Sequence, residues 1–241
     1  MKVVLHAHST WSYDGTWTLD DIAKLYGPMG VAAVMMSEHD TGFDPSRYQE
    51  FRKACDHAST EKCRIIPGIE YSCPNNDVHI LTWGLTEFLT EHQPVLDTLK
   101  RVKERGGVAI FAHPARRAAW AQFDENWVPY LTGIELWNRK SDGISYCPEA
   151  WRLLEKHGIA ATVGQDFHRL RHFYPLTMRA DIAAATEDQL VKALRDGRMV
   201  PHVFGQPLLS PTGTPRTGLH DRAEKLRRVL RDLRNRVSNR A

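Results

Sequence analysis

Short runs of β-branched and aliphatic residues alternate with segments of helical periodicity from the amino terminus to about residue 164. The short runs predict strands at Val3–His6, Ala32–Ser37, Arg64–Ile69, Val78–Trp83, Val108–Phe111, Gly133–Trp137 and Ala160–Gly164. The periodic segments predict helices at Leu19–Tyr26, Ser46–Ser59, Val95–Arg105 and Glu149–His157. Strand and helix in repeated alternation are typical of an α/β protein with a parallel sheet, either closed as a barrel or open and doubly wound.

The pattern changes near the carboxyl end. Residues 205–215 are rich in Gly, Pro, Ser and Thr and are predicted to be a linker between a domain at 1–204 and a helix at 216–241. Apolar positions in that last segment recur at spacings of four and three, at Leu219, Ala223, Leu226, Leu230, Leu233 and Val237. This apolar seam is too short for an isolated coiled coil. We therefore expect the helix to dock on the outer wall of its own domain rather than pair with a second copy.

Composition and charge narrow the class of protein. The chain has 241 residues, of which 42% are hydrophobic and 25% charged, which suits a folded globular protein. The longest apolar run, Val31–Met36, is far too short to span a membrane, and no secretory signal begins the sequence. Four cysteines without a C-x-x-C pair indicate reduced thiols, so we expect a cytoplasmic protein without a membrane partner.

Charge is uneven along the sequence. Residues 216–241 hold nine Lys/Arg against three Asp/Glu, a net charge of +6, whereas residues 1–215 hold 23 against 26, a net charge of −3. A basic helix of this kind can attract nucleic acid through its phosphates, although a solvated helix face is the commoner explanation.

Histidine is unusually frequent, with 12 in the chain. Many of the histidine, aspartate and glutamate residues that could bind a metal lie near predicted strand ends. In parallel β/α folds the carboxyl ends of the strands are where sites are built. The polar residues at or near these positions are His6, His8, Asp14, Glu38, His39, Glu70, His79, His113, Glu135, Asn138, Asp166 and His168. Residues i and i+2 of a strand share a face, so His6 and His8 are expected to bind one ion together. The remaining histidines away from strand ends, such as His57 and His157, are expected to be structural.

Imidazole and carboxylate groups are ligands of Zn, Mn and Fe, and mixed sets leave coordination positions open. Nine of these residues are candidate ligands, which is more than one ion needs, so we expect two or three divalent ions with Glu70 as a bridge. The nine candidates are His6, His8, Asp14, His39, Glu70, His79, His113, Asp166 and His168. Adjacent ions activate a bridging water as hydroxide and hold the attacking and leaving oxygens of a displacement. The pattern therefore predicts metal-dependent hydrolysis of a phosphate ester.

At these residues the sequence resembles the PHP family, named for polymerase and histidinol phosphatase domains. The motifs that carry the resemblance are H-A-H-S-T-W-S-Y-D-G (6–15), E-H-D (38–40), G-I-E (68–70), V-H-I-L (78–81), A-H-P (112–114), E-L-W-N (135–138) and Q-D-F-H (165–168). They extend over about 70% of the chain, from Leu5 to His168. The resemblance implies a distorted (β/α)7 barrel in residues 1–204, with two or three ions at its mouth, and phosphoesterase activity.

The resemblance also implies how the ions are held. The first ion would bind His6, His8, Glu70 and Asp166; the second Glu70, His79 and His113; and the third Asp14, His39 and His168. The family's second motif more often reads T-D-H, whereas this chain has Ser37-Glu38-His39, which leaves the role of Glu38 open. Within the bacterial phosphoesterase branch, which contains nucleases and nucleotide phosphatases, A-H-P is commonly followed by an arginine, here Arg116.

Roles in substrate binding and catalysis follow as expectations. Arg116 is predicted to hold the substrate phosphate, and Asn138 is a second predicted substrate contact. Glu70, Asp14 and His39 are the predicted catalytic residues, with Glu38 a further candidate for the proton donor. Trp11, Tyr13 and Trp120 are candidates for an aromatic wall, although packing explains such residues more often.

Several substrate classes remain open. The small size of the chain resembles the bacterial phosphoesterase branch rather than a polymerase, and we expect the substrate to be a phosphorylated small molecule or a nucleotide. The alternatives are a nuclease acting on short RNA or DNA, a sugar-phosphate or phosphotyrosine phosphatase, and a non-catalytic metal-binding scaffold. The sequence leaves the oligomeric state open as well.

Overall fold

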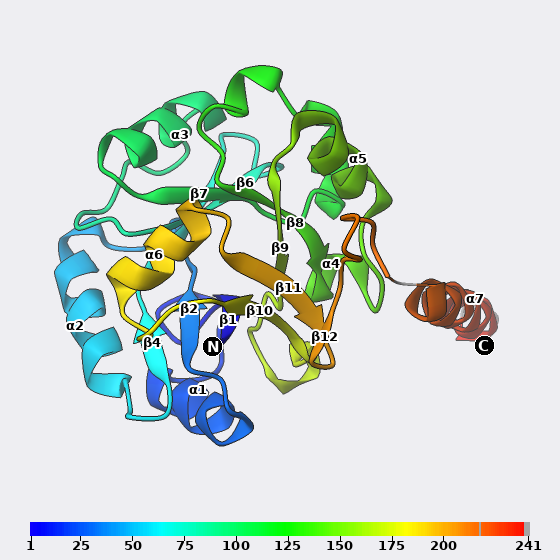
Figure 1. Cartoon of the computed structure of the whole chain (residues 1–241), viewed down its shortest axis with the longest axis horizontal. Helices are drawn as coiled ribbons and strands as arrows, with labels where there is room; N and C mark the ends of the chain where they lie inside the picture. Colours follow the sequence, from blue (N-terminus) through cyan, green and yellow to red (C-terminus); the bar gives the residue numbers. More distant parts are fainter. Residues whose placement is uncertain (217, 239–241) are drawn as a thin grey trace.

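Two six-stranded sheets form the centre of the molecule, and helices surround them (Figure 1). The computed structural model describes residues 1–216 and 218–238, without the side chains of residues 228 and 231–238. The strands are β1 (Lys2–Ala7), β2 (Ala33–Met36), β3 (Glu38–His39), β4 (Arg64–Ile66), β5 (Gly68–Ser72), β6 (His79–Trp83), β7 (Val108–Phe111), β8 (Gly133–Asn138), β9 (Ala160–Gly164), β10 (Leu176–Ala180), β11 (Met199–Val203) and β12 (Gln206–Pro207). The α-helices are α1 (Leu19–Tyr26), α2 (Tyr48–Ala58), α3 (Val95–Glu104), α4 (Arg139–Asp142), α5 (Pro148–His157), α6 (Glu187–Arg195) and α7 (Gly218–Ser238). The 3-10 helices are η1 (Gly27–Met29), η2 (Pro45–Arg47), η3 (Arg116–Gln122), η4 (Glu125–Trp127) and η5 (Leu170–His172).

The strand order is β12-β11-β10-β1-β2-β4 in one sheet and β3-β5-β6-β7-β8-β9 in the other. The prediction of a mixed α/β fold is thus confirmed, with two sheets in place of one continuous ring. Two breaks separate them: Ser37 lies between β2 and β3, and Pro67, which has no N–H to donate to a ladder, lies between β4 and β5. An isolated parallel bridge between Ala7 and Phe167 joins the end of β1 to the segment after β9.

The expectation of an all-parallel sheet is wrong around β6. This strand pairs antiparallel with β5 on one side and with β7 on the other. The segment between β5 and β6 has only residues 73–78, too few for the crossover helix that a parallel pair needs. The amino-terminal end of β6 therefore lies at the same edge as the carboxyl end of β5.

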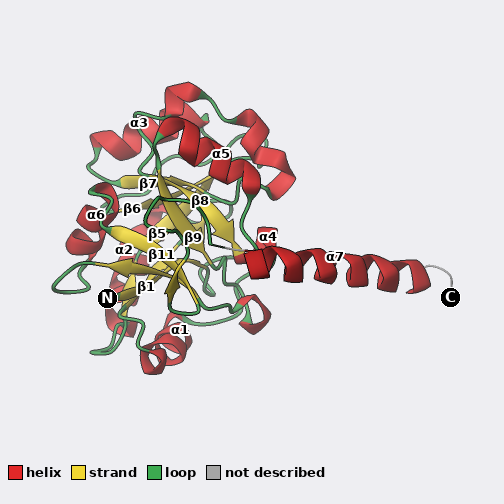
Figure 2. Ribbon diagram, turned by 45° about the vertical axis from the view of Figure 1, so that its right-hand side comes forward, coloured by secondary structure: helices red, strands yellow, loops and turns green. Residues whose placement is uncertain are grey.

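Helix α7 is attached to the body at its first two turns and then projects away from it (Figure 2). The buried Glu224 carboxylate accepts a hydrogen bond from the Ile144 N–H at 3.1 Å, and the His220 ring lies 5.3 Å from that of Trp137. Leu219 and Leu226 of the apolar seam are 79% and 60% exposed. The predicted docking of this seam on the outer wall is therefore wrong for the side chains that the structure describes; those of Leu233 and Val237 lie outside them. Among the described residues, no helix combines the length and apolarity needed to cross a membrane.

Gly68 leaves room for the Trp83 indole of its own sheet to reach Met36 of the other sheet. A Cβ at this position would lie 2.3 Å from the Trp83 indole and 2.4 Å from the carbonyl oxygen of Met36, which accepts a hydrogen bond from the indole N–H. Gly68→Ala is expected to lower the free energy of unfolding by about 1–3 kcal/mol, because the buried indole must move. Chemical denaturation measures the change, and Gly218→Ala, whose Cβ meets no atom within 4 Å, is the matched control. Equal stability of both variants and the parent would contradict this packing argument.

Candidate metal centre

The H-x-H and D-x-H motifs lie side by side because the end of β1 pairs with the segment after β9. The His8 N–H donates to the carbonyl of Phe167 at 2.8 Å, and the Phe167 N–H donates to that of His6 at 3.2 Å. The register between β1 and β2 shifts between Leu5 and Ala7, so His6 lies in a bulge. This bulge, and not simple strand alternation, turns both histidines into the site.

Three predicted ligands have a backbone conformation that L-residues rarely adopt. The φ angle is +64° at His6, +30° at His113 and +50° at Asp166. Such conformations cost free energy and persist where the surrounding structure enforces them, which is common at functional sites.

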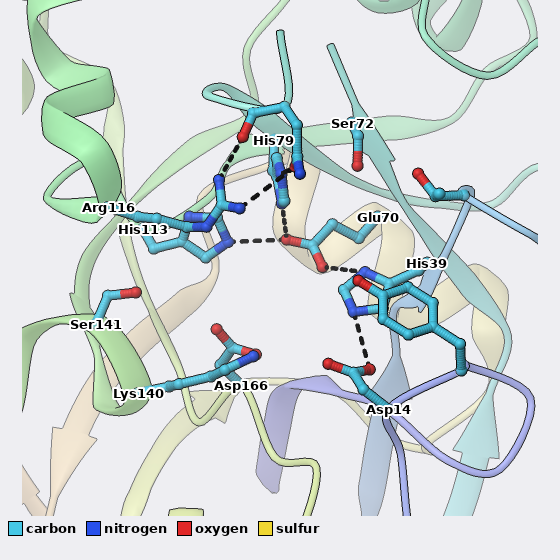
Figure 3. Close-up of a pocket in the computed structure, with 13 residues that line it drawn as sticks. Asp14, His39, Glu70, Ser72, His79, His113, Arg116, Lys140, Ser141 and Asp166 are labelled. Carbon is cyan, nitrogen blue, oxygen red and sulfur yellow. Dashed lines mark hydrogen bonds and ion pairs between the residues drawn. The ribbon is translucent and has the colours of Figure 1, made fainter. Parts of the chain in front are cut away.

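The carboxylate of Glu70, at the end of β5, lies at the centre of the site (Figure 3). Its Oε1 atom is 2.7 Å from Nδ1 of His79 and 2.8 Å from Nε2 of His113, and its Oε2 atom is 3.1 Å from Nδ1 of His39. The reversed direction of β6 brings its first residue, His79, to this point. Glu70 thus contacts the predicted second ligand set and one member of the third.

The first predicted ligand set is arranged around a common centre. Nε2 of His6 is 3.6 Å from Glu70 Oε1 and 3.7 Å from Asp166 Oδ1, and Nε2 of His8 is 3.4 Å and 3.6 Å from Glu70 Oε2 and Asp166 Oδ1. Ligands at about 2.1 Å from a tetrahedral ion lie about 3.4 Å apart, so the spacing suits a cation. Both Nε2 atoms are buried and have no hydrogen-bond partner. His6 donates through Nδ1 to Glu135 at 2.8 Å, which leaves the Nε2 lone pair for a metal.

The third predicted set also has an imidazole nitrogen that is positioned to bind a metal. Nδ1 of His168 donates to the carbonyl oxygen of Asp166 at 3.0 Å, so its Nε2 carries a lone pair. That lone pair faces Asp14 Oδ2 at 3.1 Å and lies 3.4 Å from Nε2 of His39. Electron-rich atoms this close need a proton or a metal ion between them. Three groups of residues have ligand atoms close enough together to hold one ion: His6, His8 and Asp166; His6, Glu70 and His113; and His8, His39 and His168. The first group falls within the first predicted set, whereas the other two combine members of different predicted sets.

The pKa shifts of the clustered residues also favour the binding of cations. Burial alone would raise the pKa of Glu70, but the charges of His79 and His6 and hydrogen bonds from His113 and His39 hold it well below its usual range. Burial alone would lower the pKa of His39, whereas hydrogen bonds to Asp14 and Glu70 raise it to about 10. The carboxylates are thus ionised and draw positive charge into the site, which divalent ions supply when they bind.

A network beneath the ligands fixes their orientation. Glu135 accepts from His6 through Oε1, and its Oε2 accepts from the His113 N–H at 2.8 Å and from Nδ2 of Asn138 at 2.9 Å. A Cβ on Gly164 would lie 1.8 Å from Glu135 Oε1, so only glycine leaves room for this carboxylate. Partners of this kind set the tautomer and the direction of a metal-binding imidazole.

A pocket of about 350 Å³ opens over the ligands. Its lining includes the predicted Arg116, whose Nη1 donates to the Asn76 carbonyl at 2.7 Å, and Tyr13, which is 75% exposed and stacks on His39. Sequence reasoning missed other lining residues, namely Thr41, Ser72, Asn76, Lys140 and Ser141. Lys140 carried a usable signal, because it is a cation two residues after the E-L-W-N motif.

The expectation for Asn138 is wrong, whereas the roles that the sequence left open for Trp11 and Glu38 are answered. Asn138 is fully buried below the pocket, where its side chain bonds to Glu135 and accepts from the Ser141 N–H, so it has no surface for a substrate. Trp11 packs beside Phe43 and Phe51 rather than forming a pocket wall. Glu38 is buried and accepts hydrogen bonds from Ser9 and Ser12, which orders the loop that carries Asp14 and removes Glu38 from contact with a substrate.

Comparison with known proteins gives structural likenesses only. No family model matches the chain, and no curated protein matches it in sequence. A two-domain protein from Bacteroides vulgatus containing a predicted PHP-like metal-dependent phosphoesterase has a TM-score of 0.60 and 16% identity; the match covers 87% of this chain and 65% of that one. A protein from Bifidobacterium adolescentis assigned as a metal-dependent phosphoesterase has a TM-score of 0.53 and 15% identity over 80% of this chain and 95% of that one. PsfC from Pseudomonas syringae has a TM-score of 0.60 and 14% identity over 94% and 97%. The chain therefore has the fold of PHP-like metal-dependent phosphoesterases, as its motifs predict.

Glu135→Gln tests the orienting network. The amide cannot accept from His6, His113 and Asn138 together, so either a donor is left unpaired or His6 changes tautomer and loses its Nε2 lone pair. Metal affinity is expected to fall about 10- to 100-fold, with little change in fold. Titration with a competing chelator measures the affinity, circular dichroism checks the fold, and the exposed Glu155→Gln is the control. Parent-like affinity in Glu135→Gln would show that the network does not orient the ligands.

Proposed function

We propose that the chain is a metal-dependent phosphoesterase that hydrolyses a small phosphorylated metabolite or a nucleotide. One observation carries the proposal: buried imidazole nitrogens without hydrogen-bond partners face ionised carboxylates at the floor of a pocket lined by Arg116. The nine predicted ligands gather there from both sheets. Two or three divalent ions bound there would activate water and neutralise the charge on phosphate oxygens.

The chain's own residues have separable roles in this proposal. Glu70 lies within 4 Å of five of the predicted histidine ligands through its two carboxylate oxygens and would bridge two ions. Arg116 holds the substrate phosphate, since Asn76 engages only two of the five guanidinium N–H donors. Asp14 and His39 line the pocket, and Asp14 is one-third exposed, so we assign proton transfer to the leaving group to this pair in the form with two ions, in which neither residue holds a metal.

The size of the pocket favours a small substrate. A pocket of about 350 Å³ is at the lower end of the range for small-molecule sites. Tyr13 at its rim offers an aromatic face for a sugar or base beyond the phosphate. A nuclease would instead need a groove that follows the backbone of a nucleic-acid strand.

Reconstitution with metal tests the function. Protein loaded with Mn²⁺, Zn²⁺ or Fe²⁺ is expected to bind about two to three ions per chain and to hydrolyse phosphate esters. The substrate panel should contain mononucleotides, sugar phosphates, a phosphotyrosine peptide, a phosphodiester and short RNA. Glu70→Gln is expected to lose both bound metal and hydrolysis. A metal-loaded parent that cleaves none of these substrates would contradict the proposal and favour a binding scaffold, and cleavage of RNA alone would favour a nuclease.

Arg116→Ala tests the phosphate contact. Loss of a charge-assisted hydrogen bond is expected to lower kcat/KM about 10- to 1000-fold at unchanged metal content. Steady-state kinetics and elemental analysis measure the two quantities. Arg117→Ala is the matched control, because Arg117 is adjacent and exposed but does not line the pocket. Equal kinetics in the two variants would return Arg116 to a surface role.

A further inference from the structure

Lys140 places an ammonium group against two of the proposed metal ligands. Its Nζ atom is 3.1 Å from Nε2 of His168 and 3.4 Å from Oδ1 of Asp166. The side chain is 39% exposed and lines the pocket, so a ligand in the pocket can reach it. Figure 3 shows Lys140 and Arg116 at the same hollow, with Ser141 between them in this view.

The position of Lys140 is fixed by the network below the site. Helix α4 starts directly after β8, where the Asn138 side chain accepts from the Ser141 N–H at 3.0 Å and the Asn138 N–H donates to Asp142 at 2.7 Å. The preceding cation, Arg139, lies over the ring of Tyr174 instead. Of these two consecutive basic residues, Lys140 alone lines the pocket.

The contact with His168 conflicts with metal binding. Because Nδ1 of His168 donates to the Asp166 carbonyl, Nε2 is the ring atom that would bind an ion, and it faces both Lys140 and Asp14. An ion bound to this atom would take the place of the ammonium beside it. A divalent ion at this position would also repel an ammonium a few ångströms away.

We propose that Lys140 is an exchangeable cation that serves first the empty metal site and then the substrate. Without metal, its ammonium neutralises Asp166 and lies against His168. When a divalent ion binds His168, the flexible side chain turns into the pocket and donates to an oxygen of the substrate phosphate, near Arg116. This inference rests on the proposed function and adds a second cationic contact to the same site.

A structural role makes the opposite prediction. If Lys140 only stabilised Asp166, its removal would loosen the ligand set and weaken metal binding. An exchangeable cation competes with the metal, so its removal strengthens metal binding and weakens phosphate binding. These changes of opposite sign identify the exchange.

Lys140→Met tests the proposal, because methionine keeps an unbranched side chain and removes the charge. Competition with a chelator is expected to show Mn²⁺ bound about 3- to 10-fold more tightly, since a competing charge is lost. Calorimetric titration of the metal-loaded protein with inorganic phosphate is expected to show binding about 10- to 100-fold weaker, as for a lost charge-assisted hydrogen bond. Lys140→Arg should restore most of the phosphate affinity. Lys156→Met on α5, where the lysine is exposed and paired with Glu125, is the control and should change neither constant.

Parent-like phosphate affinity in Lys140→Met, or metal binding that becomes weaker, would overturn the proposal. Both measurements are binding constants and need no turnover. A parent protein that hydrolyses no phosphate ester would therefore contradict the proposed function, whereas unchanged constants in an active protein would contradict only the role of Lys140.

Discussion

The carboxylate of Glu70 is 1% exposed and surrounded by imidazoles, and a charge in that position must be compensated. The protein supplies the compensation from four different strands or strand ends: His6 from β1, His39 from β3, His79 from β6 and His113 after β7. Isolated burial of such a group would cost several kcal/mol. The arrangement of both sheets around Glu70 therefore has an electrostatic as well as a packing basis.

Positive charge at this centre can come from three sources: protons on histidine, the ammonium of Lys140, or bound metal. The raised pKa of His39 and the contacts of Lys140 correspond to the first two of these sources. Divalent ions deliver the same charge more compactly and leave open coordination positions. The backbone fixes the ligands regardless of which of these sources supplies the charge. It does so through the bulge at His6 and the left-handed backbone at His113 and Asp166.

Much of the fold, and the clustering of the predicted ligand residues, could be predicted from the sequence. Strand β7, strand β9 and helix α1 have the predicted bounds, because their hydrophobic runs are bordered by clear turn signals. Hydrophobic periodicity does not report the direction of a strand, so the antiparallel direction of β6 was not predictable. Because of that direction, His79 reaches the site from the start of its strand and not from the end. Strands β10 and β11 were missed because polar and proline positions, such as Arg179 and Pro201, interrupt their hydrophobic runs.

Side-chain roles beyond the ligands depended on burial, which sequence motifs do not report. Asn138 and Lys140 are two residues apart, yet the first lies in the buried network and the second in the pocket. Glu38 stands beside a proposed ligand in sequence but points into the loop at Ser9 and Ser12. The apolar seam of α7 is a further example, because its amphipathic pattern predicted burial but did not identify what would cover it, and the described side chains of the seam are exposed.

The turn between β5 and β6 has a consequence for how such sites diversify. Asn76 in this turn, with φ of +53°, receives Arg116 on its carbonyl and side-chain oxygens and also lies 2.6 Å from Nε2 of His79. One residue thereby couples Arg116, the proposed phosphate contact, to an imidazole of the candidate metal centre. A hairpin of different length or sequence, grafted at this point, would retune specificity and metal occupancy in a single evolutionary step, while the sheets on either side kept their packing.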